Sequence, residues 1–329
     1  MTQLWVILVI LLAGLALAGL GSLWLRYREE IRAARRRIEG LGSQVVETAC
    51  GPVEYARVGE GAPLLVVHGA MGGFDQGLWL ARGFDLCKYQ VISLSRFGYL
   101  RSPVPAGAGL DLQADAFAAL LDALGIPRAA VFAASAGTTA ALRLAARYPG
   151  RVSALVLLSP DAPGEAQMSL PPRFVFDTLL RSDFVYWLLV TFWGRWVQNA
   201  IGLVPRGYAL TPEQAAMIRT IQHGDLPVSG RMDGMLFESY TVLPEYNALL
   251  CASSAYPLQQ IETPVLVIHA LDDSIAIPAN VNRLAAAIPG ARQFTLPDGG
   301  HFLLGHVEEA RAEIERFLDA HAGSFYATD

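Results

Sequence analysis

The pattern of apolar and polar positions along the chain predicts an α/β domain. Residues 64–67 form a continuous apolar run, which is typical of a strand buried on both faces of a parallel sheet. Similar runs alternate with stretches of helical periodicity. The expected strands are 44–48, 53–58, 64–67, 90–94, 129–132, 152–158, 265–269 and 293–296, and the expected helices are 74–86, 111–124, 138–148, 279–288 and 307–320. This alternation predicts a mostly parallel, doubly wound sheet.

The alternation stops after Ser159 and Pro160 and resumes at residue 265. We interpret 161–260 as an inserted helical cap that separates two parts of the core, 44–160 and 261–321. The insertion contains an aromatic run at 184–193, which is too short and too closely flanked by charge to cross a membrane. Residues 322–329 are expected to be a frayed tail.

The N-terminus carries a second apolar segment of a different kind. Residues 4–25 contain no charged side chain and are long enough to cross the roughly 30 Å hydrocarbon core of a bilayer as one helix. Residues 26–37 follow with six arginines against two glutamates, so the positive-inside bias predicts a single-pass anchor in the cell membrane with the catalytic domain in the cytoplasm. We interpret 26–43 as a basic, solvated juxtamembrane connector. A cleaved signal peptide is the alternative, because residues 16–18 resemble an A-x-A cleavage site.

Composition excludes several classes of function. The net charge of −5 and the lack of a basic stripe outside the N-terminus argue against nucleic-acid binding. Cys50, Cys87 and Cys251 are odd in number and far apart, which favours neither a disulfide framework nor a zinc site. The histidines do not form metal-ligand spacings with a nearby carboxylate, so we predict no metal and no cofactor.

Candidate chemistry begins at Ser135, between a predicted strand and a predicted helix. A serine on such a sharp turn needs small neighbours, because its backbone is strained and its hydroxyl must project above the sheet. Ala133 and Gly137 meet that need. The resulting A-x-S-x-G departs from the usual G-x-S-x-G at its first position. The alternative interpretation is a plain helix start with Ser135 as its N-cap.

Three other segments follow predicted strands and carry reactive or backbone-donating groups. They are a glycine-rich loop at 68–73, an acidic turn at 270–274 and a Gly-Gly-His-Phe segment at 299–302. The C-terminal ends of parallel strands form the binding crevice of open α/β sheets. Ser, then Asp, then His in chain order is the triad order of one fold in particular.

On these residues the sequence resembles the α/β-hydrolase superfamily over 45–321, in the branch with an H-G-x loop and an inserted cap. The resemblance implies Ser135 as nucleophile, His301 as general base and acid, and Asp273 as the residue that orients His301. It also implies an oxyanion hole made by the backbone N–H groups of Ala70 and Ala136. In the same loop, His68 and Gly69 are expected to support that oxyanion hole.

Some assignments stay open within this resemblance. The acid is Asp273 or Asp272, which lie in the same turn, and we prefer Asp273 by its position after the strand. A third candidate, Asp161, is interpreted as a solvated loop carboxylate. Ser95 and Leu100 stand where the family pattern D-x-x-G-x-G-x-S has an aspartate and a glycine, which puts the packing of that loop in doubt.

These observations predict a membrane-anchored serine hydrolase that cleaves an ester or related acyl bond of a small, apolar substrate. The candidates for lining the substrate site are Met71, Trp187, Phe192 and Phe302. The alternative for the aromatic run is ordinary cap core. Two rival functions remain: a C–C bond hydrolase of the same fold, and a non-catalytic, membrane-tethered binding module.

Overall fold

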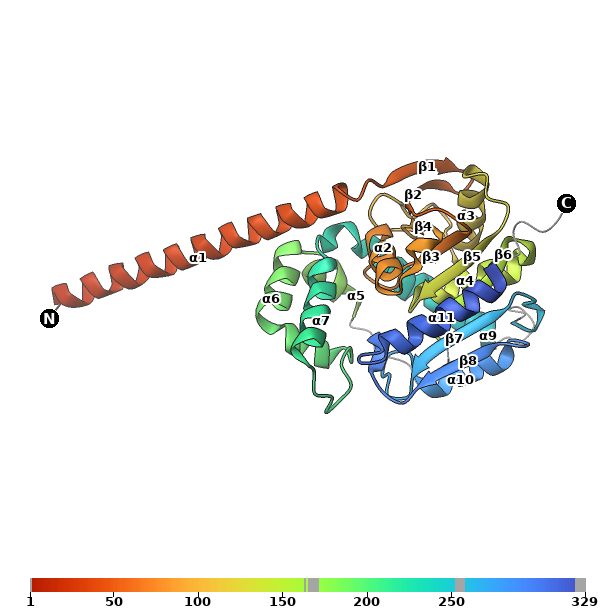
Figure 1. The fold of residues 1–329 in the computed structure, drawn as a ribbon. Helices are drawn as coiled ribbons and strands as arrows, with labels where there is room; N and C mark the ends of the chain where they lie inside the picture. Colours follow the sequence, from red (N-terminus) through yellow and green to blue (C-terminus); the bar gives the residue numbers. More distant parts are fainter. Residues whose placement is uncertain (1, 163, 165–171, 252–257, 323–329) are drawn as a thin grey trace.

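A computed structural model describes residues 2–162, 164, 172–251 and 258–322 (Figure 1). Its centre is one eight-stranded sheet with the order β1-β2-β4-β3-β5-β6-β7-β8. β2 runs antiparallel to both of its neighbours, β1 and β4, and the strands from β4 through β3 to β8 are parallel to one another. The strands are β1 Gln44–Thr48, β2 Gly51–Val58, β3 Pro63–Val67, β4 Gln90–Leu94, β5 Ala129–Ala134, β6 Val152–Leu158, β7 Val265–Ala270 and β8 Arg292–Leu296. The predicted α/β fold with a mostly parallel sheet is confirmed.

Helices cover both faces of the sheet, which explains why its inner strands are apolar throughout. Side chains alternate between the two faces, so Leu65 and Val67 pack in one apolar cluster and Leu64 and Val66 in the other. On the first face lie α3 Leu110–Ala123, α4 Gly137–Arg147 and α10 Pro278–Ala287, and on the second lie α2 Phe74–Gly83 and α11 Val307–Ala322. Of the predicted tail, residues 323–329 lie outside the described part of the chain.

The segment between β6 and β7, here called the cap, is helical in its described residues. Its helices are α5 Arg173–Val175, α6 Asp183–Ala200, α7 Pro212–Gly224, α8 Met232–Phe237 and α9 Leu243–Cys251, with π-helical turns at Phe176–Leu180 and Glu238–Val242. Short 3₁₀ turns occur at Leu86–Lys88, Pro149–Arg151, Val228–Gly230, Leu258–Gln260 and Gly300–Phe302. The start of α7 is fixed locally by a capping box, in which Thr211 and Gln214 each accept the other's backbone N–H.

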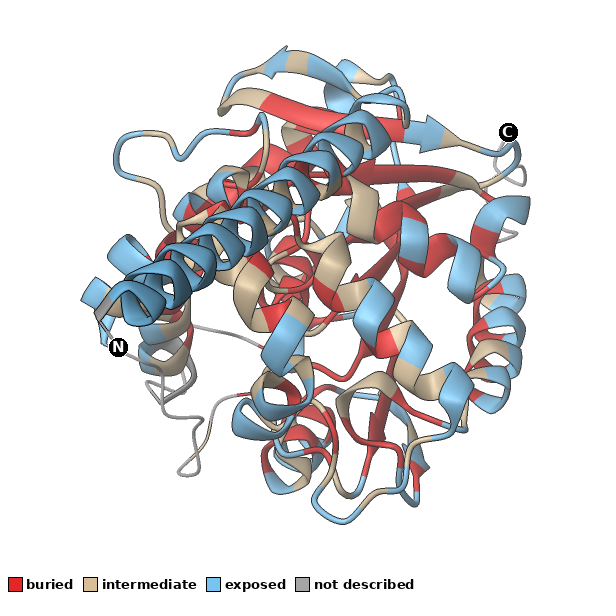
Figure 2. Ribbon diagram, turned by 90° about the vertical axis from the view of Figure 1, so that its left-hand side faces the viewer, coloured by how far each residue is buried: buried red, intermediate tan, exposed pale blue. Residues whose placement is uncertain are grey.

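The N-terminal helix, α1 Thr2–Glu39, projects from the body as one continuous rod (Figure 1). Its most apolar window has a mean hydropathy of 2.6 and is entirely unburied. Figure 2, seen from the helix side, shows α1 exposed along most of its length. This helix is long and apolar enough to be a candidate membrane span.

The C-terminal part of α1 corrects the prediction of a solvated connector. Ile31 and Ala34 are buried against Trp187 and Leu226 of the cap, and the Trp187 indole N–H donates to Glu30 at 2.7 Å. The contact stripe is Leu23, Tyr27, Ile31, Ala34 and Ile38, which recur at spacings of three and four residues. The arginines between them kept this narrow apolar stripe from being recognised in the sequence.

Candidate active site

Ser135 lies at the turn from β5 into α4, with a φ of 49° in the left-handed region that serine rarely adopts. Its N–H donates to Leu158 O at 2.9 Å, and its carbonyl accepts the Thr138 hydroxyl at 2.6 Å. Gly137 must lack a side chain, because a Cβ there would lie 2.3 Å from His68 O. Ala133, in place of the usual glycine, is buried in the apolar cluster that contains Leu65 and Val67.

The structure brings Ser135, His301 and Asp273 together. His301 Nε2 lies 2.9 Å from Ser135 Oγ, and His301 Nδ1 lies 2.9 Å from Asp273 Oδ2. Asp273 Oδ1 also accepts the backbone N–H groups of Ile275 and Ala276 at 2.8 and 2.9 Å. These bonds fix the carboxylate, which in turn orients the imidazole so that its other nitrogen faces the serine.

Asp272 has a different position. Its carboxylate accepts the N–H groups of Gly299 and Gly300, and so holds the backbone of the loop that carries His301. Ser159 supports the same loop from β6, since its hydroxyl donates to His301 O at 3.0 Å. This contact could not be predicted from the sequence, because the two residues are 142 positions apart.

The charges in this group favour an ionised carboxylate beside a basic imidazole. Burial raises the pKa of Asp273, but His301 and the two backbone donors outweigh it, so the net pKa is lowered. Burial likewise lowers the pKa of His301, but Asp273 and, more weakly, Asp161 outweigh it, and the net pKa is raised. With Asp273 ionised, Nδ1 of neutral His301 carries the proton and Nε2 is free to accept from Ser135.

The glycine-rich loop after β3 lies beside Ser135. The Arg96 N–H donates to His68 Nε2 at 3.0 Å, so His68 Nδ1 carries the proton and donates to Gly69 O at 2.7 Å. Burial, followed by the nearby Arg96 charge, lowers the pKa of His68 well below its usual value, which keeps the ring neutral. Ala70 and Ala136 both line the cavity in front of Ser135.

A buried ion pair links this loop to the cap. Arg96 pairs with Glu238, which also accepts the Tyr99 hydroxyl at 2.9 Å. The second Nη of Arg96 donates to Gly69 O at 2.9 Å. The position of the loop therefore depends on Glu238, a cap residue that sequence reasoning did not single out.

The departures from the family pattern have local explanations. The Ser95 hydroxyl accepts the Phe74 N–H and donates to the Glu54 carboxylate on β2. Ser95 therefore links the loop to a carboxylate on another strand, where the family pattern has a carboxylate at the position of Ser95 itself. Leu100 has a φ of 53° where the pattern has a glycine. The loop thus keeps its backbone shape at the cost of a strained leucine, roughly 1–3 kcal/mol for such conformations.

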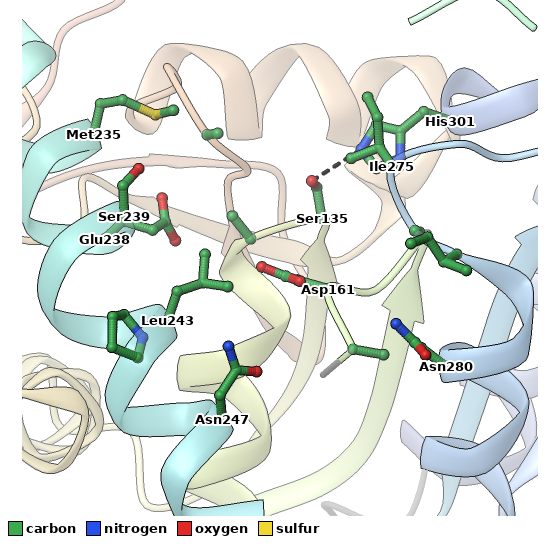
Figure 3. A pocket seen from close by; sticks show the side chains of 16 residues that line it. Ser135, Asp161, Met235, Glu238, Ser239, Leu243, Asn247, Ile275, Asn280 and His301 are labelled. Atoms are coloured by element: carbon green, nitrogen blue, oxygen red, sulfur yellow. Dashed lines mark hydrogen bonds between the residues drawn. The ribbon is translucent and has the colours of Figure 1, made fainter. Parts of the chain in front are cut away.

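Asp161 is not the solvated loop carboxylate that the sequence suggested. It is half-buried at the end of β6 and lines the cavity with Ser135 and His301 (Figure 3). Burial and the nearby Glu238 raise the pKa of Asp161 to about 6. A carboxyl group that changes charge near neutral pH therefore lies beside the serine.

The cavity in front of Ser135 measures about 190 Å³. Its described lining combines apolar side chains of the cap and core with the polar groups Asp161, Glu238, Ser239, Asn247 and Asn280 (Figure 3). A group of three or more His, Cys, Asp or Glu side chains that could hold a metal is absent from the part of the chain that the structure describes.

The four predicted lining residues lie elsewhere. Trp187 is buried between α6 and α1, and Phe192 is half exposed on α6. Phe302 packs with Val204 and Ile218, and Met71 packs in a cluster with Phe176 and Met232. The aromatic run on α6 therefore faces α1 and the surface. The orientation of α6 relative to Ser135 depends on how the whole cap packs, so it could not be predicted from the local sequence.

The chain is similar over most of its length to known hydrolases. Residues 62–305 match the family described as alpha/beta hydrolase fold. A putative carbamate hydrolase, RutD of Klebsiella pneumoniae subsp. pneumoniae, is 30% identical over 249 residues, which cover 73% of this chain and 85% of the relative. A 2-hydroxymuconate semialdehyde hydrolase of Pseudomonas putida is 26% identical, covering 79% and 88% of the two chains. The solved structure of an alpha/beta hydrolase fold protein from Nakamurella multipartita superimposes with a TM-score of 0.67 and 28% identity, covering 85% of this chain and 99% of that one. The chain belongs to the α/β-hydrolase family and is a hydrolase.

Proposed function

We propose that this protein is a serine hydrolase that cleaves a carboxylic ester or related acyl bond through an acyl-enzyme on Ser135. The observation that carries the proposal is the hydrogen-bonded series from Ser135 through His301 to Asp273. A serine hydroxyl is a weak nucleophile until a base takes its proton, and this arrangement provides the base and its orienting carboxylate.

In the first half of the reaction, Ser135 Oγ attacks the substrate carbonyl carbon while its proton passes to His301 Nε2. The carbonyl oxygen takes the electron pair of the broken π bond and accepts hydrogen bonds from the N–H groups of Ala70 and Ala136. The tetrahedral species collapses, the leaving group receives the proton from His301, and the acyl group stays on Ser135. In the second half, His301 Nε2 takes a proton from a water molecule whose oxygen attacks the acyl carbon. The new tetrahedral species collapses, Ser135 Oγ leaves and receives that proton from His301, and the carboxylic acid is released.

The cavity supports a compact substrate group with both apolar and polar character. Its volume of about 190 Å³ compares with the roughly 150 Å³ that suffices to hold benzene. We therefore expect turnover of p-nitrophenyl esters to be highest for short acyl chains. The Klebsiella relative is named as a putative carbamate hydrolase, and a carbamate carries a carbonyl carbon that a serine nucleophile could attack.

The second candidate is a C–C bond hydrolase, which the Pseudomonas relative favours. The two reactions are separated by giving the enzyme 2-hydroxymuconate semialdehyde and the ester series in parallel. Faster turnover of the semialdehyde than of every ester would favour the rival.

A fluorophosphonate probe tests the serine chemistry directly and separates an enzyme from a non-catalytic binding module. The wild-type chain and Ser239→Ala should be labelled, and Ser135→Ala should not. Ser239 is a matched control because it lines the same cavity without a hydrogen bond to His301. Labelling of Ser135→Ala at the wild-type rate would refute the assignment of the nucleophile.

We further propose that α1 anchors the enzyme in the cell membrane with the hydrolase domain in the cytoplasm. The apolar helix and the arginines that follow it support this topology. The protein should stay in the membrane pellet after alkaline carbonate washing, and protease added to spheroplasts should leave the hydrolase domain uncut. A mature N-terminus at Gly19 would instead establish signal-peptide cleavage.

A further inference from the structure

The cap carries large aromatic side chains that are exposed on one surface of α6. Phe192, Trp193 and Trp196, which we call the aromatic patch, are 50%, 56% and 66% exposed. They lie outside the described lining of the cavity and belong to none of the apolar clusters. Large adjacent aromatics in contact with water mark a surface that binds something apolar.

Ring contacts connect the aromatic patch to the end of the apolar segment of α1. Trp24, in the last turn of the uncharged segment 4–25, lies 5.8 Å from Phe184 of α6, measured between ring centroids. From there the contacts continue from Phe184 to Trp187 at 6.0 Å, from Trp187 to Phe192 at 6.0 Å and from Phe192 to Trp193 at 6.1 Å.

The contacts of Arg26, the first charged residue after the apolar segment, show where along α1 the aromatic patch lies. Its guanidinium lies 5.9 Å from the centre of the Phe192 ring and 5.8 Å from that of Trp187. In Figure 1, α6 lies at the end of the body toward which α1 projects. The patch is therefore at the same height along α1 as the boundary between its apolar and basic parts.

That boundary is where a membrane surface must lie if residues 4–25 occupy the hydrocarbon. Tryptophan and other aromatic side chains favour this level of a bilayer, because their rings are apolar and the indole N–H can hydrogen-bond to headgroups. Exposed arginines occur in both helices near this level: Arg195 stands between Trp193 and Trp196 in the sequence of α6, and Arg28 follows Arg26 on α1. Their charges match the phosphates of anionic lipids.

We infer that the aromatic patch of α6 is a membrane-binding surface that inserts into the headgroup region of the same bilayer that α1 crosses. The inference rests on the proposed anchoring of α1. Because α1 already packs on the cap through Ile31 and Ala34, insertion of the patch beside it would limit how far the hydrolase domain can tilt relative to the bilayer.

The test uses the full chain reconstituted in vesicles of phosphatidylcholine and phosphatidylglycerol, with and without brominated acyl chains, which quench tryptophan only on contact. We compare the wild type with Trp193→Phe/Trp196→Phe, Trp79→Phe and Trp5→Phe. The difference in emission between the wild type and the double variant is the contribution of Trp193 and Trp196, and the brominated lipid should quench this contribution. The emission lost in Trp79→Phe should not be, because Trp79 is an exposed tryptophan on α2, outside the cap.

The Trp5 variant separates the two proposals, because Trp5 lies within the apolar part of α1. Quenching of Trp5 without quenching of Trp193 and Trp196 would overturn the membrane-binding surface and leave the anchor standing. If the brominated lipid quenched neither Trp5 nor the two cap tryptophans, the anchor would be overturned as well. If the two cap tryptophans were shielded from both brominated lipid and aqueous iodide, a second protein chain would cover the patch, and the inference would be wrong.

Discussion

Arg231 Nη2 of the cap lies 2.7 Å from Asp75 Oδ2 at the start of α2, and both side chains are buried. The other Nη of Arg231 donates to Gly72 O, in the loop that carries Ala70. Arg37 of α1 reaches the same carboxylate at 3.7 Å and donates to Gly224 O of the cap at 2.7 Å. The cap, the glycine-rich loop and α1 therefore meet at one buried carboxylate.

Replacing Arg231 should disturb both stability and catalysis. Among the described residues, Arg231→Met leaves Asp75 with the more distant cation of Arg37. Losing one partner of a buried pair costs about 3–5 kcal/mol, so we expect the free energy of unfolding in denaturant to fall by about 3 kcal/mol. Ester kcat should fall as well, because Gly72 O loses its donor. Arg181→Met is the matched control, since Arg181 pairs with Asp233 at the surface and the change should cost less than about 1 kcal/mol. Equal effects in both variants would contradict this account.

The two acids of the 270–274 turn should differ in their effect on rate. Asp273→Asn removes the carboxylate that holds the His301 tautomer, and should lower kcat by about four orders of magnitude. Asp272→Asn should act on the 299–300 backbone instead, which predicts a lower melting temperature and a much smaller loss of kcat. Measuring kcat on one ester and the melting temperature of both variants distinguishes the two roles. Similar losses of kcat would refute the assignment.

Asp161 should control the acidic limb of the pH profile. Catalysis needs neutral His301, so activity is lost as the pH falls through its pKa, which is raised in part by the charge of Asp161. Asp161→Asn removes that charge, lowers the pKa of His301 and should move the acidic limb of kcat/KM to lower pH. The surface variant Asp122→Asn should leave the limb unchanged. A shift of the Asp161→Asn limb to higher pH would contradict the sign of this coupling.

Truncation should reveal that the end of α1 is part of the folded domain. Deleting residues 1–22 removes most of the apolar segment but keeps the contact stripe from Leu23 to Ile38, and should give a soluble protein that unfolds like the full chain. Deleting residues 1–40 exposes Trp187 and leaves its indole N–H without Glu30. We expect that shorter chain to have a lower melting temperature and to aggregate, which differential scanning fluorimetry and gel filtration would detect. Identical behaviour of the two truncations would refute it.

The strands β4 and β6 begin and end where the sequence predicts, because continuous apolar runs between polar turns leave little choice of boundary. The position of Ser135, Asp273 and His301 at strand ends could also be predicted, since parallel strands bring their C-terminal ends to one edge. What could not be predicted depends on pairs distant in sequence. Glu238 and Arg96 are 142 residues apart, and neither carries a local pattern that names its partner.

The left-handed backbone of Ser135 has a consequence for the folded protein without its activity. Ser135→Ala and Ser135→Gly both remove the nucleophile, but only alanine keeps a side chain in a conformation that costs about 1–2 kcal/mol. Glycine also makes the unfolded chain more flexible, which offsets part of this stabilisation. We therefore expect the free energy of unfolding of Ser135→Gly to exceed that of Ser135→Ala by up to about 1 kcal/mol in matched denaturant titrations. Both variants lack the nucleophile, so the difference between their free energies of unfolding would report how much strain the active-site turn places on any side chain at position 135.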